Sequence, residues 1–69
     1  MITREFLSSL NFRRFTDSDY QGFAGVQSPV PMIAETTEFL IILDGNYCEV
    51  YGEDSVPLET CENVSELPY

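Results

Sequence analysis

Two apolar runs that flank a short turn sequence constrain the fold of this chain more than any other feature. Glu38–Leu43 (EFLIIL) precedes Asp44-Gly45-Asn46, and Tyr47–Tyr51 (YCEVY) follows it. Asp-Gly between β-branched and aromatic runs is the strongest short-range mark of a β-hairpin, because both residues tolerate the left-handed backbone of a tight turn. We therefore predict an antiparallel hairpin over residues 38–51, with a two-residue loop at Asp44-Gly45 or at Gly45-Asn46.

Both loop positions assign the side chains of the hairpin to the same two faces, because successive side chains alternate across a strand. One face is apolar and is predicted to be core: Phe39, Ile41, Leu43, Cys48 and Val50. The other face is mixed: Leu40, Ile42, Tyr47, Glu49 and Tyr51. A strand that is apolar on both sides is usually covered on both faces. We expect either the C-terminal segment or another protein chain to cover the mixed face.

Two helix start signals precede the hairpin. Thr3 can cap a helix that runs to about Leu10, in which Phe6, Leu7 and Leu10 recur at helical spacing and Glu5 lies in the first turn. Thr16 is followed three residues later by Asp19, as in a capping box. This second signal predicts a helix from Asp17 to about Ala24 that ends at Gly25.

The segments around the hairpin complete the predicted fold. Val26–Pro31 (VQSPVP) is a connector, because its prolines exclude helix, and Met32–Glu35 is a short strand that Pro31 marks as an edge strand. The acidic segment 52–69 can hold another strand near Val56–Thr60. We predict one small α+β domain over residues 1–69, with one or two short N-terminal helices packed on a three- to four-stranded antiparallel sheet. An all-β fold is the alternative.

The distribution of charge points to a class of partner. All three basic residues (Arg4, Arg13 and Arg14) lie in the first fourteen positions, and Phe15–Tyr69 contains eleven acidic residues without one Lys, Arg or His. Ordinary surfaces mix both signs. A net charge of −9 repels nucleic acid and anionic membranes and attracts basic protein surfaces. Because 43% of the residues are hydrophobic and 13% aromatic, the chain is too apolar for a disordered acidic tail.

The same composition argues against catalysis. Without His or Lys the chain cannot form a Cys–His or Ser–His pair, and a domain with one small core rarely also encloses a catalytic cleft. Asp17-x-Asp19 resembles the start of a calcium loop, but Phe23-Ala24 stands where further oxygen ligands belong. We expect no enzyme activity, no cofactor and no metal.

The cysteines and the apolar runs bear on the compartment. Cys48 and Cys61 are either two small thiols in a reducing cytoplasm or a single bridge. The first residues have no continuous apolar stretch of a signal peptide, and the longest apolar run, Phe39–Leu43, is far shorter than a membrane span. We expect a soluble, cytoplasmic protein.

The acidic residues themselves are the candidate binding surface. Carboxylates two residues apart on one strand face lie ~6.8 Å apart, a pitch commensurate with the ~3.4 Å charge spacing along one DNA strand. Tyr47 and Tyr51 are candidate hydrophobic anchors, because Tyr is enriched at interface hot spots. The predicted charge surface comprises ten acids: Asp17, Asp19, Glu35, Glu38, Glu49, Glu53, Asp54, Glu59, Glu62 and Glu66.

A short, Lys-free, aromatic-rich and strongly acidic chain resembles the small phage-encoded inhibitors that mimic nucleic acid. These include inhibitors of restriction enzymes, of uracil-DNA glycosylase and of CRISPR effectors. The resemblance is one of composition over Phe15–Tyr69, so it assigns neither a fold nor roles to single residues. It implies a phage origin and a basic nucleic-acid-binding protein of the host as partner. The alternative is a structural or assembly module, such as a homodimer that uses the mixed face of strand 38–43, in which the acids only maintain solubility.

Overall fold

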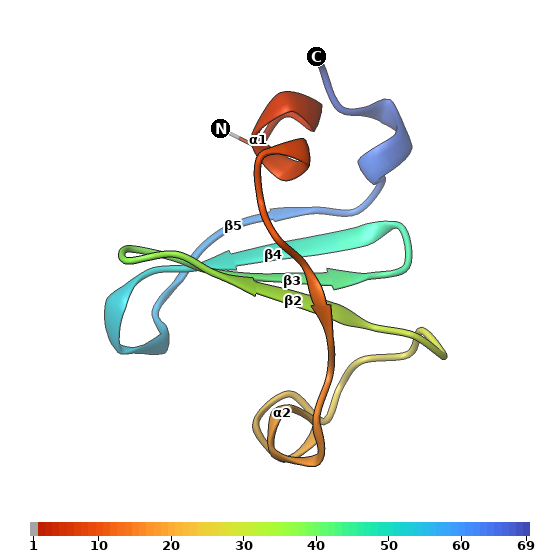
Figure 1. The fold of residues 1–69 in the computed structure, drawn as a ribbon. Coiled ribbons are helices and arrows are strands. Elements are labelled where there is room, and N and C mark those ends of the chain that lie inside the picture. Colours follow the sequence, from red (N-terminus) through yellow and green to blue (C-terminus); the bar gives the residue numbers. More distant parts are fainter. Residues whose placement is uncertain (1) are drawn as a thin grey trace.

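The computed structural model describes residues 2–69, which form two short helices and an antiparallel sheet of five strands in the order β1-β2-β3-β4-β5 (Figure 1). The predicted α+β class is confirmed, but the sheet has five strands instead of three or four. The elements are α1 (Arg4–Ser8), β1 (Arg13–Arg14), α2 (Asp17–Gly22), β2 (Met32–Glu35), β3 (Leu40–Asp44), β4 (Tyr47–Tyr51), the 3₁₀ turn η1 (Glu53–Ser55), β5 (Pro57–Cys61) and the 3₁₀ turn η2 (Val64–Glu66).

The predicted hairpin is confirmed as β3 and β4. Asp44 is paired with Tyr47, so the loop consists of Gly45 and Asn46. Gly45 has a φ of +63°, which is the left-handed conformation that this turn requires and that glycine adopts without steric cost. The first strand begins at Leu40, two residues later than predicted, because Glu38 lies in the turn that follows β2.

Both edges of the sheet lie outside the hairpin. Between the two helices, where the sequence predicted no strand, lies β1, in which Arg13 is paired with Ile33 of β2. Thus β2 has the predicted bounds but lies inside the sheet, and its prediction as an edge strand is wrong. Arginine has no strong strand preference, so a two-residue strand of arginines gives no signal in the sequence. The other edge is β5, close to the predicted strand at Val56–Thr60.

The first face of the sheet holds the apolar core, as predicted. Ile2, Ile41, Cys48 and Val50 are buried there. Partly buried apolar side chains from both ends of the chain pack against them: Phe6, Leu7, Leu10 and Phe12 from the N-terminal segment, and Cys61, Val64 and Leu67 from the C-terminal one. In α1 the Thr3 hydroxyl accepts a hydrogen bond of 3.0 Å from the Phe6 N–H, so the predicted cap is confirmed, although the helix ends at Ser8.

The C-terminal segment is held on this first face by hydrogen bonds to α1 and to the hairpin turn. The Arg4 N–H donates to the Pro68 carbonyl over 3.0 Å, and the Arg4 guanidinium donates to the Ser65 carbonyl over 2.6 Å. The Asn46 carbonyl accepts from the Val64 N–H over 2.8 Å, and the Asn46 side chain accepts from the Ser65 N–H over 3.0 Å. The two ends of the chain therefore form one layer above the sheet (Figure 1).

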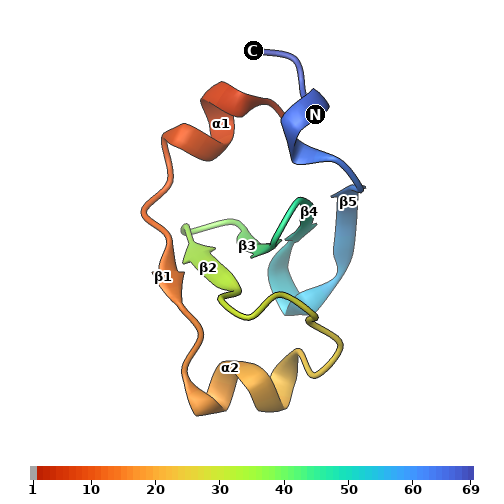
Figure 2. The ribbon, with the colours of Figure 1, turned by 90° about the vertical axis from the view of Figure 1, so that its right-hand side faces the viewer.

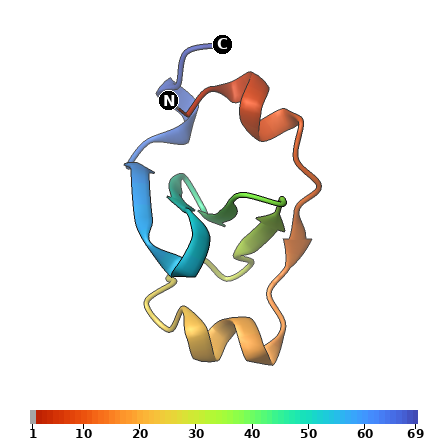
Figure 3. The same cartoon turned by 90° about the vertical axis from the view of Figure 1, so that its left-hand side faces the viewer.

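The second face is covered by α2, which lies on the opposite side of the sheet from α1 (Figures 2 and 3). Phe23 at the end of α2 contacts Tyr51 in a tilted arrangement with ring centroids 5.5 Å apart, and the Phe15 ring lies 6.3 Å from that of Phe23. Ile33 and Ile42 are fully buried. The first of the two expected covers, the C-terminal segment, is therefore wrong for this face, because that segment packs on the first face. The chain instead crosses from one face to the other at β1, between Phe12 and Phe15.

The capping box predicted at the start of α2 is confirmed. The Asp19 N–H donates to the Thr16 hydroxyl over 3.3 Å, and the Thr16 N–H donates to the Asp19 carboxylate over 2.8 Å. The helix ends at Gly22, and Phe23 is its C-cap, so the predicted end at Ala24 and Gly25 lies two residues too late. The Phe23 N–H still donates to the Asp19 carbonyl over 2.9 Å, and the Phe23 ring contacts Tyr51 of β4.

Candidate functional site

Four of the ten predicted acids line one open hollow at an end of the sheet. We call it the four-acid hollow: Glu35, Glu38, Glu53 and Asp54. Its volume is about 310 Å³, and the rest of its wall is formed by Thr36, Thr37, Phe39, Leu40, Gly52 and Ser55. The four carboxylates come from two separate segments, the β2–β3 turn and η1, which the antiparallel sheet brings to the same end.

The β2–β3 turn is closed by Thr36. Its hydroxyl accepts hydrogen bonds from the Glu38 N–H over 3.2 Å and from the Phe39 N–H over 2.9 Å. The Thr36 N–H donates to the Phe39 carbonyl over 2.9 Å. These hydrogen bonds satisfy the backbone of the turn. The side chains of Glu35 and Glu38 are exposed at the end of the sheet.

The second segment has an unusual backbone. Asp54 and Ser55 have φ values of 60° and 59°, the left-handed region that only a few non-glycine residues adopt, Asp among them. The Gly52 N–H donates to the Val56 carbonyl over 2.8 Å and closes the loop. This loop turns the chain from β4 into β5 and exposes Glu53 and Asp54 next to the β2–β3 turn.

Arg13 neutralises part of the predicted charge surface. One guanidinium nitrogen lies 2.6 Å from the Asp19 carboxylate and the other lies 3.3 Å from the Glu35 carboxylate. The hydrogen bond from Arg13 is the main cause that lowers the pKa of Asp19 to about 2, and the hydrogen bond from the Thr16 N–H is the next largest. Asp19 therefore serves the fold through its ion pair and its helix cap, and Glu35 is only partly available to a partner.

Glu49 and Tyr51 are also engaged within the protein. The Tyr51 hydroxyl donates to the Glu49 carboxylate over 2.7 Å, and the Tyr51 ring contacts Phe23. Burial and the hydrogen bond to Glu49 raise the pKa of Tyr51 to about 12. Burial also raises the pKa of Tyr47, and the charges of Glu49 and Glu62 raise it further. Tyr51 is thus a packing residue under α2, whereas Tyr47 is half-buried beside the hairpin turn.

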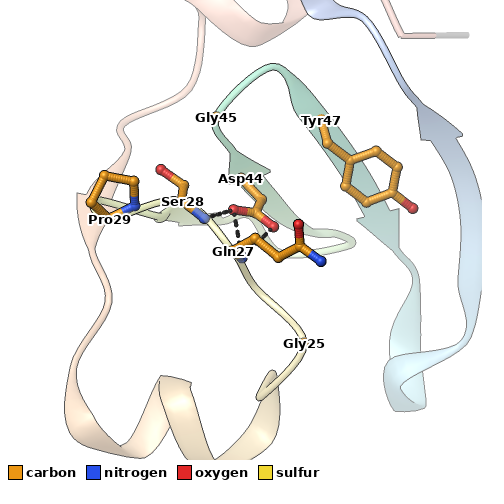
Figure 4. A pocket seen from close by; sticks show the side chains of 7 residues that line it. All are labelled: Gly25, Gln27, Ser28, Pro29, Asp44, Gly45 and Tyr47. Carbon is orange, nitrogen blue, oxygen red and sulfur yellow. Dashed lines mark hydrogen bonds between the residues drawn. The ribbon is translucent and has the colours of Figure 1, made fainter.

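A larger hollow of about 500 Å³ lies between the connector and the hairpin turn (Figure 4). In its wall, the Asp44 carboxylate accepts hydrogen bonds from the Gln27 N–H over 3.0 Å and from the Ser28 N–H over 2.6 Å. Asp44 is the one acid after Phe15 that the sequence assigned to a turn and left out of the charge surface. Its carboxylate fastens the connector to the end of β3. This use of Asp44 depends on a contact sixteen residues away in the chain, for which the sequence carries no local signal.

The remaining predicted acids do not join the four-acid hollow. Asp17 lies in the first turn of α2, on one side of the sheet, and Glu66 lies in η2 on the other side (Figure 1). Glu59 lies on β5, and Glu62 follows it. The ten acids therefore surround the molecule, and the four-acid hollow is where they are gathered around one depression.

The cysteines and the acids are not arranged as a metal site. Cys48 and Cys61 are free thiols on paired positions of β4 and β5, and burial raises the pKa of Cys48 to about 11. Over the described range 2–69, no group of three or more His, Cys, Asp or Glu side chains could hold a metal ion.

The mixed face of strand 38–43 is partly covered in this fold, because Leu40 and Tyr47 are half-buried. Ile42 is 0% exposed within one chain. The homodimer alternative expected this side chain to be buried by a second copy, and the fold buries it without one.

None of the helices in the described part of the chain is long and apolar enough to cross a membrane. Comparison with protein-family models, with curated proteins and with solved structures found no match.

Proposed function

We propose that this protein binds a basic nucleic-acid-binding protein of a host cell and occludes the surface that would hold DNA or RNA. The observation that supports this proposal is the four-acid hollow. Its Glu38, Glu53 and Asp54 side chains are exposed, and no arginine lies within ion-pair distance of them in residues 2–69. A partner rich in Lys and Arg supplies the missing positive charge.

The net charge of −9 gives the proposal its energetic basis. Individual exposed ion pairs contribute only ~0.2–1 kcal/mol, so a stable complex requires several acids to act together. Clustered negative charge also steers a basic partner toward the hollow and accelerates association at low salt. The same cationic surface cannot bind phosphates and carboxylates together, which makes the inhibition competitive.

The aromatic residues contribute less to this proposal than the acids. Tyr51 is half-buried, its ring contacts Phe23 and its hydroxyl is hydrogen-bonded to Glu49, so it is already engaged within the protein. Binding through the four-acid hollow therefore depends mainly on charge and weakens steeply as salt is added. Phosphate mimicry requires this salt dependence, whereas the affinity of an apolar interface would change little as salt is added.

A charge-reversal experiment with a matched control tests the proposal. The triple variant E38K/E53K/D54K changes three acids of the hollow, and the control D17K/E62K/E66K changes three acids elsewhere by the same charge. Each immobilised protein is incubated with bacterial lysate at low and at high salt and then eluted with duplex DNA. We expect the wild type and the control to capture nucleic-acid-binding proteins that DNA displaces, and the hollow variant to lose at least ~10-fold of this capture.

Two outcomes contradict the proposal. The first is equal capture by both triple variants, which would show that total charge and not the hollow determines binding. The second is capture that neither duplex DNA nor high salt reverses, which would exclude mimicry of phosphates. Circular dichroism of each variant establishes that loss of capture is not loss of fold.

A further inference from the structure

The outer edge of β5 is an open strand edge. Over residues 2–69, β5 pairs with β4 on one side and with no strand on the other (Figures 2 and 3). Its first four residues, Pro57–Thr60, are exposed, and Cys61 is half-buried. The opposite edge of the sheet is the two-residue strand β1, which is too short to pair with another chain. The molecule therefore protects one edge and leaves the longer one open.

The strand register shows which backbone groups this edge offers. In a two-residue hairpin the residues that flank the loop form a hydrogen-bonded pair, here Asp44 and Tyr47, and such pairs then alternate along the ladder. Glu49 is two residues beyond Tyr47, so its backbone N–H and C=O point toward β3. Thr60 lies opposite Glu49 on β5. The N–H and C=O of Thr60 consequently point away from β4, toward solvent.

We propose that this edge binds an extended Lys- or Arg-containing segment of a partner protein, which adds to the sheet as a sixth strand. The charge around β5 selects a basic occupant. Glu62 directly follows the strand, the whole chain carries a net charge of −9, and no basic residue occurs anywhere after Arg14. Opposite charges on neighbouring strands stabilise the pair, and main-chain hydrogen bonds supply the affinity.

Apolar side chains beside the edge define the rest of the occupant. Leu58 is 57% exposed and Val56 is 53% exposed, so the edge offers two apolar side chains close together in the chain. Leu58 also lines a hollow of about 240 Å³ together with Phe6, Phe39, Val50 and Glu59. Because side chains alternate across a strand, a segment in which basic and apolar residues alternate directs only one of the two sets toward this hollow and the other set toward the opposite face of the sheet.

A second copy of this chain is a poorer occupant. Antiparallel pairing of two β5 strands centred on Glu59 would place the Glu59 side chains of the two copies directly opposite each other, which is destabilising. Every register would also bring together two chains that each carry a net charge of −9. The charge that attracts a basic segment thus opposes self-association through this edge.

A peptide titration followed by NMR tests the proposal. The probe is a capped ten-residue peptide of alternating Lys and Val, and the control peptide has Glu in place of Lys. We expect the Lys peptide to shift the backbone amide signals of residues 58–61 and to slow hydrogen exchange of the Thr60 N–H, and the Glu peptide to do neither. Shifts that avoid β5, or an unprotected Thr60 N–H at saturation, would overturn the proposal.

Two variants separate this site from the four-acid hollow. Thr60→Pro removes a backbone N–H that does not take part in the pairing of β5 with β4, so the fold tolerates this change at a sheet edge. We expect the affinity of this variant for the Lys peptide to be at least tenfold weaker. The control Thr60→Ala keeps the N–H and should bind the peptide with unchanged affinity. If Thr60→Pro fails to fold, the amide map of the wild type still decides. At moderate salt, E38K/E53K/D54K should change the peptide affinity less than threefold, whereas a large loss would place the peptide at the hollow. A concentration-dependent dimer in sedimentation would favour a second copy at this edge.

Discussion

The two faces of the sheet are covered by different chemistry. On the first face, Ile2, Ile41, Cys48 and Val50 are covered by apolar side chains from both ends of the chain. On the second face, Ile33 and Ile42 are equally buried, but their surroundings include rings and polar contacts such as the Tyr51–Glu49 hydrogen bond. A chain of 69 residues with a charge of −9 has too few apolar residues to build two identical layers. Aromatic rings and hydrogen bonds complete the second one.

The difference has a consequence for stability. Removing atoms from the apolar first face lowers the free energy of unfolding, and the stabilisation that this face provides does not depend on the ionisation of side chains. The layer over the second face depends in addition on the Asp19 cap, the Arg13 ion pairs and the Asp44 hydrogen bonds. Conditions that remove charge should therefore loosen the α2 layer before the α1 layer.

The largest expected effect comes from removing matched side chains on the two faces. Ile41 and Ile42 are neighbours on β3, both are 0% exposed, and they point to opposite faces. Replacing either with Ala removes buried methyl groups and leaves a cavity, at a cost of about 2–5 kcal/mol. We expect the loss of stability in Ile41→Ala to lie at the upper end of this range, because the cavity it leaves is lined by apolar side chains and cannot hold a water molecule. Urea unfolding measures both, and a clearly greater loss for Ile42→Ala would reverse the comparison.

An intermediate effect is expected at Asp44, which attaches the connector to the second face. Asp44→Ala removes a charged acceptor and leaves the Gln27 and Ser28 N–H groups without it, which should cost about 1–3 kcal/mol. Asp44→Asn keeps one acceptor oxygen and should lose less. Thermal unfolding of both variants gives the order, and an Ala variant as stable as the wild type would show that this attachment is unimportant.

Local patterns predicted most of the elements. Asp44-Gly45, the two threonine caps and the alternation along the hairpin correctly located β3, β4, α1 and α2. The sequence did not reveal β1, because its pairing with β2 is a long-range contact between residues without strand preference. It also left open whether the C-terminal segment or another chain covers the mixed face, whereas the C-terminal segment packs on the first face. Which face each segment covers depends on where the chain crosses the sheet. That crossing lies at β1, for which the sequence has no local signal.

The candidate site was only partly predictable for the same reason. Composition singled out the acids, but it could not separate exposed ones such as Glu38 and Glu53 from Asp19, which caps a helix and pairs with Arg13. The capping box itself was visible in the sequence, so a structural role for Asp19 could have been given priority. The grouping of the β2–β3 turn with η1 follows only from the sheet order.

The smallest expected effect concerns the pH dependence of the second face. The pKa of Asp19 is lowered to about 2 in the folded protein, against ~3.9 in an unfolded chain. A lowered folded-state pKa means that the carboxylate stabilises the fold above about pH 4, and that this contribution disappears as the pH falls toward 2. The stability difference between the wild type and Asp19→Asn should therefore shrink over that range.

The comparison with Asp19→Asn is needed because acid also protonates the other carboxylates. Their protonation relieves the repulsion of a chain with net charge −9 and acts in the opposite direction. Since both proteins share this effect, the difference between their urea midpoints isolates Asp19. Arg13→Gln removes the main cause of the lowered pKa and should move the loss to higher pH. A difference that stays constant from pH 5 to pH 2 would show that the α2 layer is held by its rings alone, and the two faces would then differ in shape but not in their response to charge.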